Sequence, residues 1–245
     1  MFNTSFFFNV YEKLFMNDFS DVLINHIKSG KIKFKNKNLV VFDIGAYKGT
    51  FSKHMSNNLN LKNKKINFYL FDPLKKLVKF NAKSLKNSKY YEVAFNASKP
   101  NYKKFYLNNF LHASGSSLNG QSFKDKKYII SRNIIAFFIN PFQKMVKIIK
   151  VKTDNINNFC KKNKIKYINV LKIDTEGTEV EVLSGCKKIL SKTDIICVEI
   201  QTSKKKFPLR IKKIEKILGK RFTLFYKKRI YIASFLTGIV FSIDV

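Results

Sequence analysis

The feature that most restricts the fold is a strand–helix–strand pattern between residues 168 and 200. The run INVLKID (168–174) predicts a strand, TEVEVLSGCKKIL (178–190) a helix, and IICVEI (195–200) the next strand. Thr178 and Glu181 have the spacing of a capping box, which marks a helix N-terminus. Continuous apolar strands separated by a helix are typical of a parallel sheet that is buried on both faces.

The same alternation extends over most of the chain. Further strands are predicted at 39–44, 66–71, 90–95, 103–107 and 147–151, and helices at 15–27, 50–59, 74–82, from 154 onward and at 209–218. The closing strands 222–226 and 230–235 have no helix between them, which favours an antiparallel hairpin at the sheet edge. We therefore expect an α/β fold: a mostly parallel sheet with helices on both faces and an antiparallel C-terminal edge hairpin.

The charge is strongly one-sided. The chain has 48 Lys and Arg against 16 Asp and Glu, a formal net charge of +32. Such a charge favours an anionic partner, such as nucleic acid, a membrane surface or a charged glycan. Only Arg132, Arg210, Arg221 and Arg229 are arginines, however, and arginine is the preferred residue for paired contacts to phosphates and base edges. Because Lys, Asn, Ile and Phe are all abundant, an AT-biased genome explains the charge better than nucleic-acid binding does.

The three cysteines, Cys160, Cys186 and Cys197, form no CxxC pair and are odd in number. They are typical of small buried hydrophobes in a reducing compartment rather than of disulfides or a zinc site. The histidines show no metal-ligand spacing, the N-terminus has no convincing signal peptide, and no apolar run reaches the ~18 residues of a membrane span. We expect a cytoplasmic protein without a transmembrane segment.

A first cluster of candidate site residues is DIGAYKG (43–49), between a predicted buried strand and a helix. Gly45 permits a sharp turn close to a ligand, and Gly49 with Thr50 opens a helix whose N–H groups suit a carboxylate or phosphate. The glycine spacing differs from the dinucleotide pattern GxGxxG. An ordinary strand-to-helix turn explains this cluster about equally well.

A second cluster, FDP (71–73), lies at the end of the next strand. An acidic side chain at this position of a doubly wound fold holds the ribose hydroxyls of an adenosine cofactor. Asp72 follows Asp43 by 29 positions, beyond the usual ~20, because an Asn- and Lys-rich loop intervenes. A helix cap is the more common use of a lone Asp before Pro. Taken together, the first two clusters favour an adenosyl ligand.

A third cluster, KIDTEG (172–177), ends a central strand. Lys172 and Asp174 share one face of the strand, and Glu176 follows in the turn. These groups suit removal of a proton from an attacking hydroxyl or binding of a divalent cation. Carboxylates that merely favour a helix N-terminus are the alternative, which we prefer for Glu179 but not for Asp174.

The motifs DIGAYKGTFSKHM, LFDP, TDNINNFC, VLKIDTEGTEVEVLSG and CVEIQ occur in order between about Leu39 and Gln201. In this combination the chain resembles the FkbM-type methyltransferases, and KIDTEGTEVEVLSG is the most specific part. The resemblance implies a Rossmann-like class I methyltransferase fold, S-adenosylmethionine as methyl donor, and O-methylation.

The resemblance also implies roles for individual residues. The methionine end of the cofactor would be lined by Asp43, Gly45, Ala46 and Gly49, the ribose bound by Asp72, and adenine flanked by Val93 and Ala94. Asp72 stands where the family more often has Glu, so the shorter carboxylate must approach the ribose more closely.

From these residues and the resemblance we expect an O-methyltransferase that acts on a hydroxyl of a glycan, glycolipid or small metabolite. Asp174 is the expected principal acceptor-side carboxylate, with Glu176 assisting and Lys172 orienting the oxygen or tuning Asp174. His112, in a serine-rich loop, is more typical of a solvated or capping residue. Two alternatives stay open: an RNA methyltransferase, and a non-enzymatic basic module that binds nucleic acid or an anionic membrane surface.

No repeat or Pro/Gly-rich linker divides the 245 residues, so we expect a single domain over 1–245. It would comprise an N-terminal helical extension (1–38), a cofactor-binding and catalytic core (39–201), and a C-terminal helix with edge strands (202–245). The apolar segment 128–142 either covers the acceptor site or belongs to the core. A metal requirement and the oligomeric state are left open.

Overall fold

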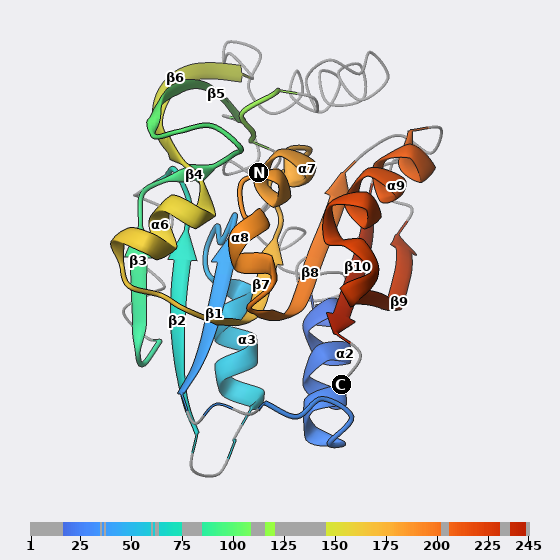
Figure 1. Cartoon of the computed structure of the whole chain (residues 1–245). Coiled ribbons are helices and arrows are strands. Elements are labelled where there is room, and N and C mark those ends of the chain that lie inside the picture. The colour runs from blue at the N-terminus through green and yellow to red at the C-terminus, as the bar shows by residue number, and fades with distance from the viewer. Residues whose placement is uncertain are drawn as a thin grey trace, which may run out of the picture.

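The computed structural model describes residues 17–34, 36, 38–59, 61, 64–74, 85–108, 116–120, 146–201, 206–230 and 236–243. A seven-stranded sheet forms the body of the molecule, and a three-stranded sheet lies above its upper edge (Figure 1). The segment 128–142, His112 and nearly all of the helix predicted at 74–82 lie outside the described residues. The division of the chain at residues 38 and 201 stays a prediction.

The large sheet has the strand order β3-β2-β1-β7-β8-β10-β9. Its strands are β1 (Asn38–Ile44), β2 (Lys65–Phe71), β3 (Ser88–Tyr91), β7 (Ile168–Ile173), β8 (Thr193–Gln201), β9 (Phe222–Ile230) and β10 (Leu236–Ile243). The first five of these are parallel neighbours, whereas β10 runs antiparallel to both β8 and β9. The mostly parallel sheet with an antiparallel C-terminal hairpin is therefore confirmed. The strand order reverses between β1 and β7, which is where open α/β sheets bind their ligands.

The second strand of the hairpin does not lie where the sequence predicted it. β9 extends to Ile230, and the second strand is Leu236–Ile243 rather than 230–235. This strand, β10, is inserted between β8 and β9, with Leu236 opposite Gln201 of β8. The prediction is wrong because β-propensity shows which residues favour a strand but not where the chain turns. Pairing with β8 decides that boundary.

Helices cover both faces of the large sheet (Figure 1). On one face, side chains of α2 (Asn17–Lys28) and α3 (Thr50–Asn58) pack into one core cluster. On the other face, a second cluster takes side chains from four helices: α6 (Ile156–Lys162), α7 (Glu179–Ser184), α8 (Lys187–Leu190) and α9 (Phe207–Leu218). The short helix η3 (Gly219–Arg221) follows α9. Alternate residues of the central strands belong to opposite clusters. In β1, Phe42 and Ile44 pack with α6 to α9, whereas Val41 packs with α2 and α3. Each central strand is therefore buried on both sides, as its continuous apolar sequence indicates.

The helix predicted at 178–190 is divided into α7 and α8. Gly185 ends α7 and packs so closely that an added Cβ would lie 2.3 Å from the carbonyl oxygen of Asn96. The carbonyl oxygen of Gly185 accepts a hydrogen bond from the backbone N–H of Asn157 in α6. The predicted capping box is absent as well, because Thr178 makes no side-chain cap and instead donates to the carbonyl oxygen of Thr175. Contacts with distant segments, rather than local propensity, decide how this helix begins and ends.

A small sheet has the order β4-β6-β5, from β4 (Ala94–Phe95), β5 (Asn101–Asn108) and β6 (Val146–Asp154). The strand predicted at 90–95 is divided between the two sheets, since 88–91 pairs with β2 and 94–95 pairs with β6. Ala94 and Phe95 lie opposite Thr153 and Asp154, so the chain leaves the large sheet between Tyr91 and Ala94. A local pattern cannot show this change, because the two halves pair with different strands that lie far apart in the chain.

The cysteines and the helices bear on two further expectations. Cys160, Cys186 and Cys197 are buried and free, as the sequence predicts. Among the residues that the structure describes, no helix is long and apolar enough to cross a membrane.

Phe159 of α6 anchors that helix to the sheet. Its ring lies 4.9 Å from the centroid of Phe71 and 4.7 Å from that of Tyr91, in edge-to-face geometry, and it also contacts Phe42 and Phe95. Edge-to-face pairs add to the free energy gained by burying each ring. Phe159 therefore joins helix α6 to strands β1, β2 and β3.

We predict that Phe159→Ala lowers the free energy of unfolding by about 3–5 kcal/mol, because it leaves a cavity among four aromatic rings. Urea unfolding followed by circular dichroism measures the change. Leu209→Ala in α9 is the matched control, since Leu209 is 58% exposed and should change stability by less than about 0.5 kcal/mol. Equal effects of the two substitutions would show that Phe159 does not anchor α6.

Candidate functional site

The three sequence clusters meet at the carboxyl edge of the large sheet. Asp43 in β1 is the direct neighbour of Lys172 in β7, because the two strands pair in parallel with these residues in register. Gly45 follows β1, Asp72 follows β2, and Asp174 follows β7. The edge lies at the reversal of strand order, so residues from distant parts of the chain form one site there.

The turn after β1 is held against the end of β2. The backbone N–H groups of Gly45 and Ala46 both donate to the carbonyl oxygen of Phe71, at 2.9 and 3.0 Å. Gly45 has a φ of 73°, and a Cβ added to it would lie 1.7 Å from the carbonyl oxygen of Asp174. Glycine is therefore required here both for the backbone conformation and for the close approach of the loop after β7. Gly49, also at a φ of 73°, then precedes the first residue of α3.

Asp72 connects the turns that follow β1 and β2. Its Oδ2 accepts a hydrogen bond from the backbone N–H of Tyr47 at 3.0 Å, and its Oδ1 accepts one from Leu74 at 2.8 Å. The side chain is buried, and burial raises the pKa of Asp72 to about 6, although both hydrogen bonds act to lower it. The bond to Leu74 is local, but the bond to Tyr47 spans the site, so Asp72 is more than a cap for the segment after it.

Lys172 is a buried cation at the centre of the edge. Its Nζ donates to the carbonyl oxygen of Gly45 at 3.1 Å and to Oδ2 of Asp174 at 3.2 Å, and lies 3.2 Å from Oδ1 of Asp43. Burial alone would lower the pKa of Lys172, but the carboxylates of Asp174, Asp43 and Glu199 outweigh burial and raise it above its usual value. Lys172 therefore stays protonated and holds the two turns together.

Asp43 is fully buried, and two elements engage its carboxylate. Oδ1 pairs with Lys172, and Oδ2 accepts a hydrogen bond from the hydroxyl of Ser52 in α3 at 2.7 Å. Asp43 thereby fixes the start of α3 relative to β1 and β7. This geometry gives Asp43 a clear structural part in positioning the glycine turn.

The turn after β7 carries the acceptor-side residues that the sequence predicted. The backbone N–H of Asp174 donates to the carbonyl oxygen of Ile44 at 2.9 Å, which keeps this turn beside the one after β1. The side chain of Asp174 is 16% exposed, more than that of Lys172 (7%) or Asp43 (none). Glu176, half-buried, has a φ of 56°, a conformation that is unusual for a residue with a side chain. Backbone strain of this kind often occurs at functional sites.

Glu179 is the first residue of α7, as expected for a carboxylate at a helix N-terminus, but the sequence did not predict its buried ion pair. It is fully buried, Oε1 accepts the backbone N–H of Gly177, and Oε2 pairs with Nη1 of Arg210 in α9 at 2.8 Å. Arg210 Nη2 and the side-chain amide of Asn119 each donate to the carbonyl oxygen of Gly177 at 2.7 Å. Burial raises the pKa of Glu179 to about 7 against the opposing effect of Arg210. Glu179 and Arg210 together fix the turn that carries Glu176.

Glu199 of β8 is a residue that the sequence analysis did not single out. It is half-buried, and its pKa lies well above the usual value because of burial and of the neighbouring carboxylates of Asp174 and Glu176, with Lys172 opposing them. Its place near the end of the strand beside β7 was the available signal, because parallel strands end at the same edge. The motif CVEIQ contained it without indicating a role.

Val93 and Ala94 lie where the chain passes from β3 to β4. Both are buried: Val93 belongs to the main core, and Ala94 packs with Phe105 and Val151 of the small sheet. Their predicted contact with adenine stays a prediction. Across the described parts of the chain, no group of three or more His, Cys, Asp or Glu side chains is arranged to hold a metal ion.

Comparison with known proteins adds a family and a fold. The family model described as the methyltransferase FkbM domain matches residues 43–224. A solved structure of methyltransferase FkbM from Methylobacillus flagellatus KT is similar with a TM-score of 0.50 at 10% identity, over 87% of this chain. The match covers 45% of that protein, so this chain spans less than half of its length. At such low identity the likeness bears on the fold alone, and it confirms the Rossmann-like fold expected from the sequence.

A solved rRNA methylase from Streptococcus thermophilus also matches, with a TM-score of 0.41 at 10% identity, over 85% of this chain and 88% of that one. No curated protein matches the chain.

We predict that Gly45→Ala destabilises the protein more than Gly30→Ala does. Both glycines have a φ of 73°, but a Cβ at Gly30 would meet only the end of the Lys33 side chain at 3.9 Å. The shared conformation costs about 1–2 kcal/mol for alanine. Displacing the backbone of Asp174 adds a further ~1–3 kcal/mol at Gly45. Thermal unfolding of the two variants measures the difference, and equal melting temperatures would contradict the close approach.

Proposed function

The chain belongs to the FkbM family of S-adenosylmethionine-dependent methyltransferases, and from this premise we propose that it methylates a hydroxyl of a glycan, glycolipid or small metabolite. The observation that supports this proposal most is the reversal of charge at the carboxyl edge. The chain has only 16 acidic residues against 48 basic ones. Six of the 16 gather at this edge: Asp43, Asp72, Asp174, Glu176, Glu179 and Glu199. An acidic site in a strongly basic protein suits a cationic donor.

S-adenosylmethionine supplies an electrophilic methyl group on a sulfonium when it is bound. The residues present fit this donor, because Asp72 offers a buried carboxylate for ribose hydroxyls and the carboxylates of the edge complement positive charge. We assign Asp43, Gly45, Ala46 and Gly49 to the methionine end. Val93 and Ala94 are assigned to adenine, since they follow the end of β3, the strand beside β2.

On the acceptor side, we assign Asp174 as the carboxylate that takes the proton of the hydroxyl. Its Oδ2 is held by Lys172, so the proton goes to Oδ1. Lys172 stays protonated and acts by orienting Asp174, and Glu176 assists from the same turn. Because Lys172 also holds the carbonyl oxygen of Gly45, it aligns the acceptor side with the cofactor turn. Alignment of this kind supplies much of the rate of a displacement reaction.

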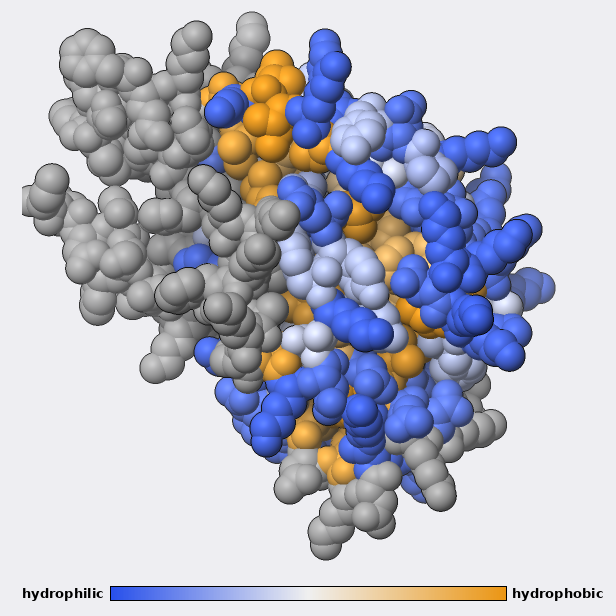
Figure 2. All heavy atoms as spheres, turned by 90° about the vertical axis from the view of Figure 1, so that its left-hand side faces the viewer, coloured by the Kyte–Doolittle hydropathy of each residue, from blue (hydrophilic) through white to orange (hydrophobic). Residues whose placement is uncertain are grey.

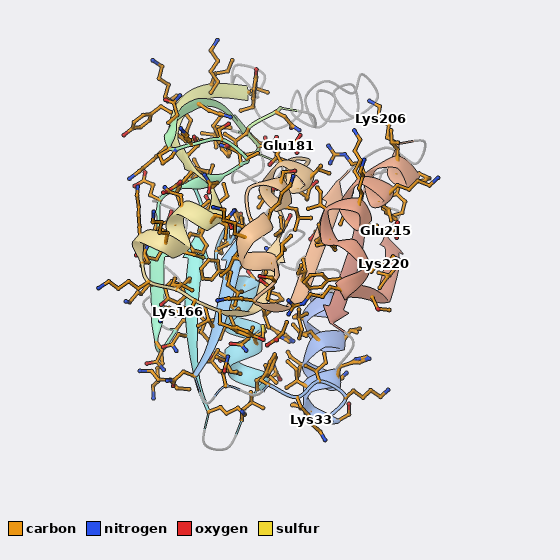
Figure 3. All side chains as sticks on the ribbon, in the orientation of Figure 1. Lys33, Lys166, Glu181, Lys206, Glu215 and Lys220 are labelled. Carbon is orange, nitrogen blue, oxygen red and sulfur yellow. The ribbon has the colours of Figure 1, made fainter. Side chains whose placement is uncertain are left out.

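RNA methylation is the alternative that the charge suggests. The exposed lysines, however, are spread over the molecule: Lys33, Lys166, Lys206 and Lys220 come from different segments and point in different directions (Figure 3). This spread is explained better by amino-acid composition than by a binding path for a polyanion.

The free, buried cysteines support the proposal that the protein is cytoplasmic.

We predict that the protein binds S-adenosylmethionine with a Kd of about micromolar magnitude and binds NAD negligibly. The affinity should be constant above about pH 7 and fall as the pH drops through 6. The raised pKa of Asp72, about 6, means that its carboxyl group becomes protonated there and no longer accepts two ribose hydroxyls. Isothermal titration calorimetry between pH 5 and pH 8 measures the profile.

Asp72→Asn is the control for that profile. The amide cannot ionise, so the variant should bind more weakly and show no dependence on pH in this range. A flat profile in the unaltered protein would remove Asp72 from the ribose, and a preference for NAD would end the methyltransferase proposal.

We predict that Asp174→Asn lowers kcat by roughly two orders of magnitude, the usual scale of general-base catalysis, while the Kd for the donor changes less than about threefold. Transfer of labelled methyl groups to a panel of hydroxylated sugars and glycolipids measures turnover. Glu181→Gln is the matched control, because Glu181 is an exposed acid of α7 that points away from the sheet (Figure 3). If Asp174→Asn keeps near-full turnover, proximity alone carries the reaction.

A further inference from the structure

The small sheet has one face turned inward and one turned to the surface. Phe105 and Val151 point inward, into a cluster with Ala94. Because side chains alternate along a strand, the residues of even number from 102 to 106 in β5 and from 148 to 152 in β6 share the opposite face. The strand register places Tyr102 opposite Lys152, Lys104 opposite Lys150, and Tyr106 opposite Ile148. We call these six residues the outer face of the small sheet; five of them are exposed, whereas Tyr106 is half-buried and its ring lies against Gly120.

Large apolar side chains are exposed on this outer face. In the described part of the chain, the exposed large hydrophobic side chains are Tyr102 (67%), Ile148 (56%) and Leu209 (58%). Two of these three lie on the outer face, in neighbouring strands. Hydrophobic and hydrophilic atoms lie side by side there, at the upper end of the view in Figure 2. Lysines occur over the whole surface, but here they surround exposed apolar groups.

The lysines of the outer face also lie close to one another. Lys104 and Lys150 are exposed and directly opposite in the antiparallel pair, and Lys152 is the next outward residue of β6. Like charges in this arrangement destabilise a sheet. β5 has no acidic residue, and the only one in β6, Asp154, is buried and accepts hydrogen bonds from Asn155 and Asn158. A negatively charged partner would relieve this repulsion.

We propose that the outer face of the small sheet docks on an anionic lipid bilayer. Lysine ammonium groups attract anionic headgroups as point charges, tyrosine suits the headgroup level, and an exposed isoleucine gains free energy only in an apolar medium. Nucleic acid fits less well, because it offers no such medium for Ile148 and the outer face has no arginine for phosphate contacts.

The position of the small sheet gives this docking a consequence. The small sheet lies above the carboxyl edge of the large sheet, at the same end of the molecule as the candidate site (Figure 1). Docking would bring that site close to the bilayer surface. This proposal concerns where the protein binds, and it does not require the methyl acceptor to be known.

Sedimentation of the full chain with vesicles tests the docking. We expect binding to phosphatidylcholine vesicles that contain phosphatidylglycerol and little binding to pure phosphatidylcholine. The triple variant Lys104→Gln/Lys150→Gln/Lys152→Gln should bind roughly 100-fold more weakly, since each surface lysine contributes about fivefold. Its melting temperature should not fall, because the substitutions remove like-charge repulsion. Ile148→Ser should also weaken binding to the vesicles. Because this loss is apolar rather than electrostatic, it should stay the same size when salt is added.

The triple variant Lys212→Gln/Lys213→Gln/Lys216→Gln is the matched control, since it removes the same charge from exposed positions of α9. It should bind vesicles within about threefold of the unaltered protein. Equal losses in both triple variants would overturn the proposal in favour of net charge. Absence of binding to anionic vesicles would overturn it as well. So would tighter binding to a single-stranded RNA probe than to vesicles, if Lys104→Gln/Lys150→Gln/Lys152→Gln weakened RNA binding by the same factor. Donor binding without vesicles tests the methyltransferase proposal separately.

Discussion

The buried ammonium of Lys172 is the interaction on which the rest of the site depends. Asp43 has no exposed surface, and Lys172 is the cation that compensates its charge. Loss of one partner of such a buried pair costs about 3–5 kcal/mol, because the other charge stays buried. The same ammonium holds the carbonyl oxygen of Gly45 and the carboxylate of Asp174. One side chain thus joins the turn after β1 to the turn after β7, the two turns that would align donor and acceptor.

A second, half-buried cation extends this organisation to the C-terminal part of the chain. Arg210 of α9 reaches Glu179 and the carbonyl oxygen of Gly177, and Asn119 binds the same carbonyl oxygen from another loop. The turn that carries Glu176 is therefore held by one segment inside the core and by one that follows it. The region after Gln201, which lies beyond the motifs found in the sequence, contributes directly to the geometry of the site.

Acidic and basic side chains lie in different parts of the molecule, although the net charge of +32 suggests a uniformly basic protein. Acidic residues gather at the carboxyl edge, where burial keeps the pKa values of Asp72, Glu179 and Glu199 above their usual range. Lysines lie mostly on the surface, and on the outer face of the small sheet they accompany exposed Tyr102 and Ile148. Composition explains how many lysines the chain has. The exposed apolar side chains beside some of them indicate which lysines form the proposed docking surface.

The sequence by itself determined the alternation of strands and helices, the glycine turn at Gly45, and the meeting of Asp43, Asp72, Lys172 and Asp174 at one edge. Apolar periodicity is local, and parallel strands always end at the same edge, so these features need no knowledge of packing. Only the tertiary structure decided the division of 90–95 between two sheets, the start of β10 at Leu236, the pairing of Glu179 with Arg210, and the approach of Glu199. Each of these depends on a partner far away in the chain. Hydrogen bonds and ion pairs between such partners form only when the packing of the sheet brings them together.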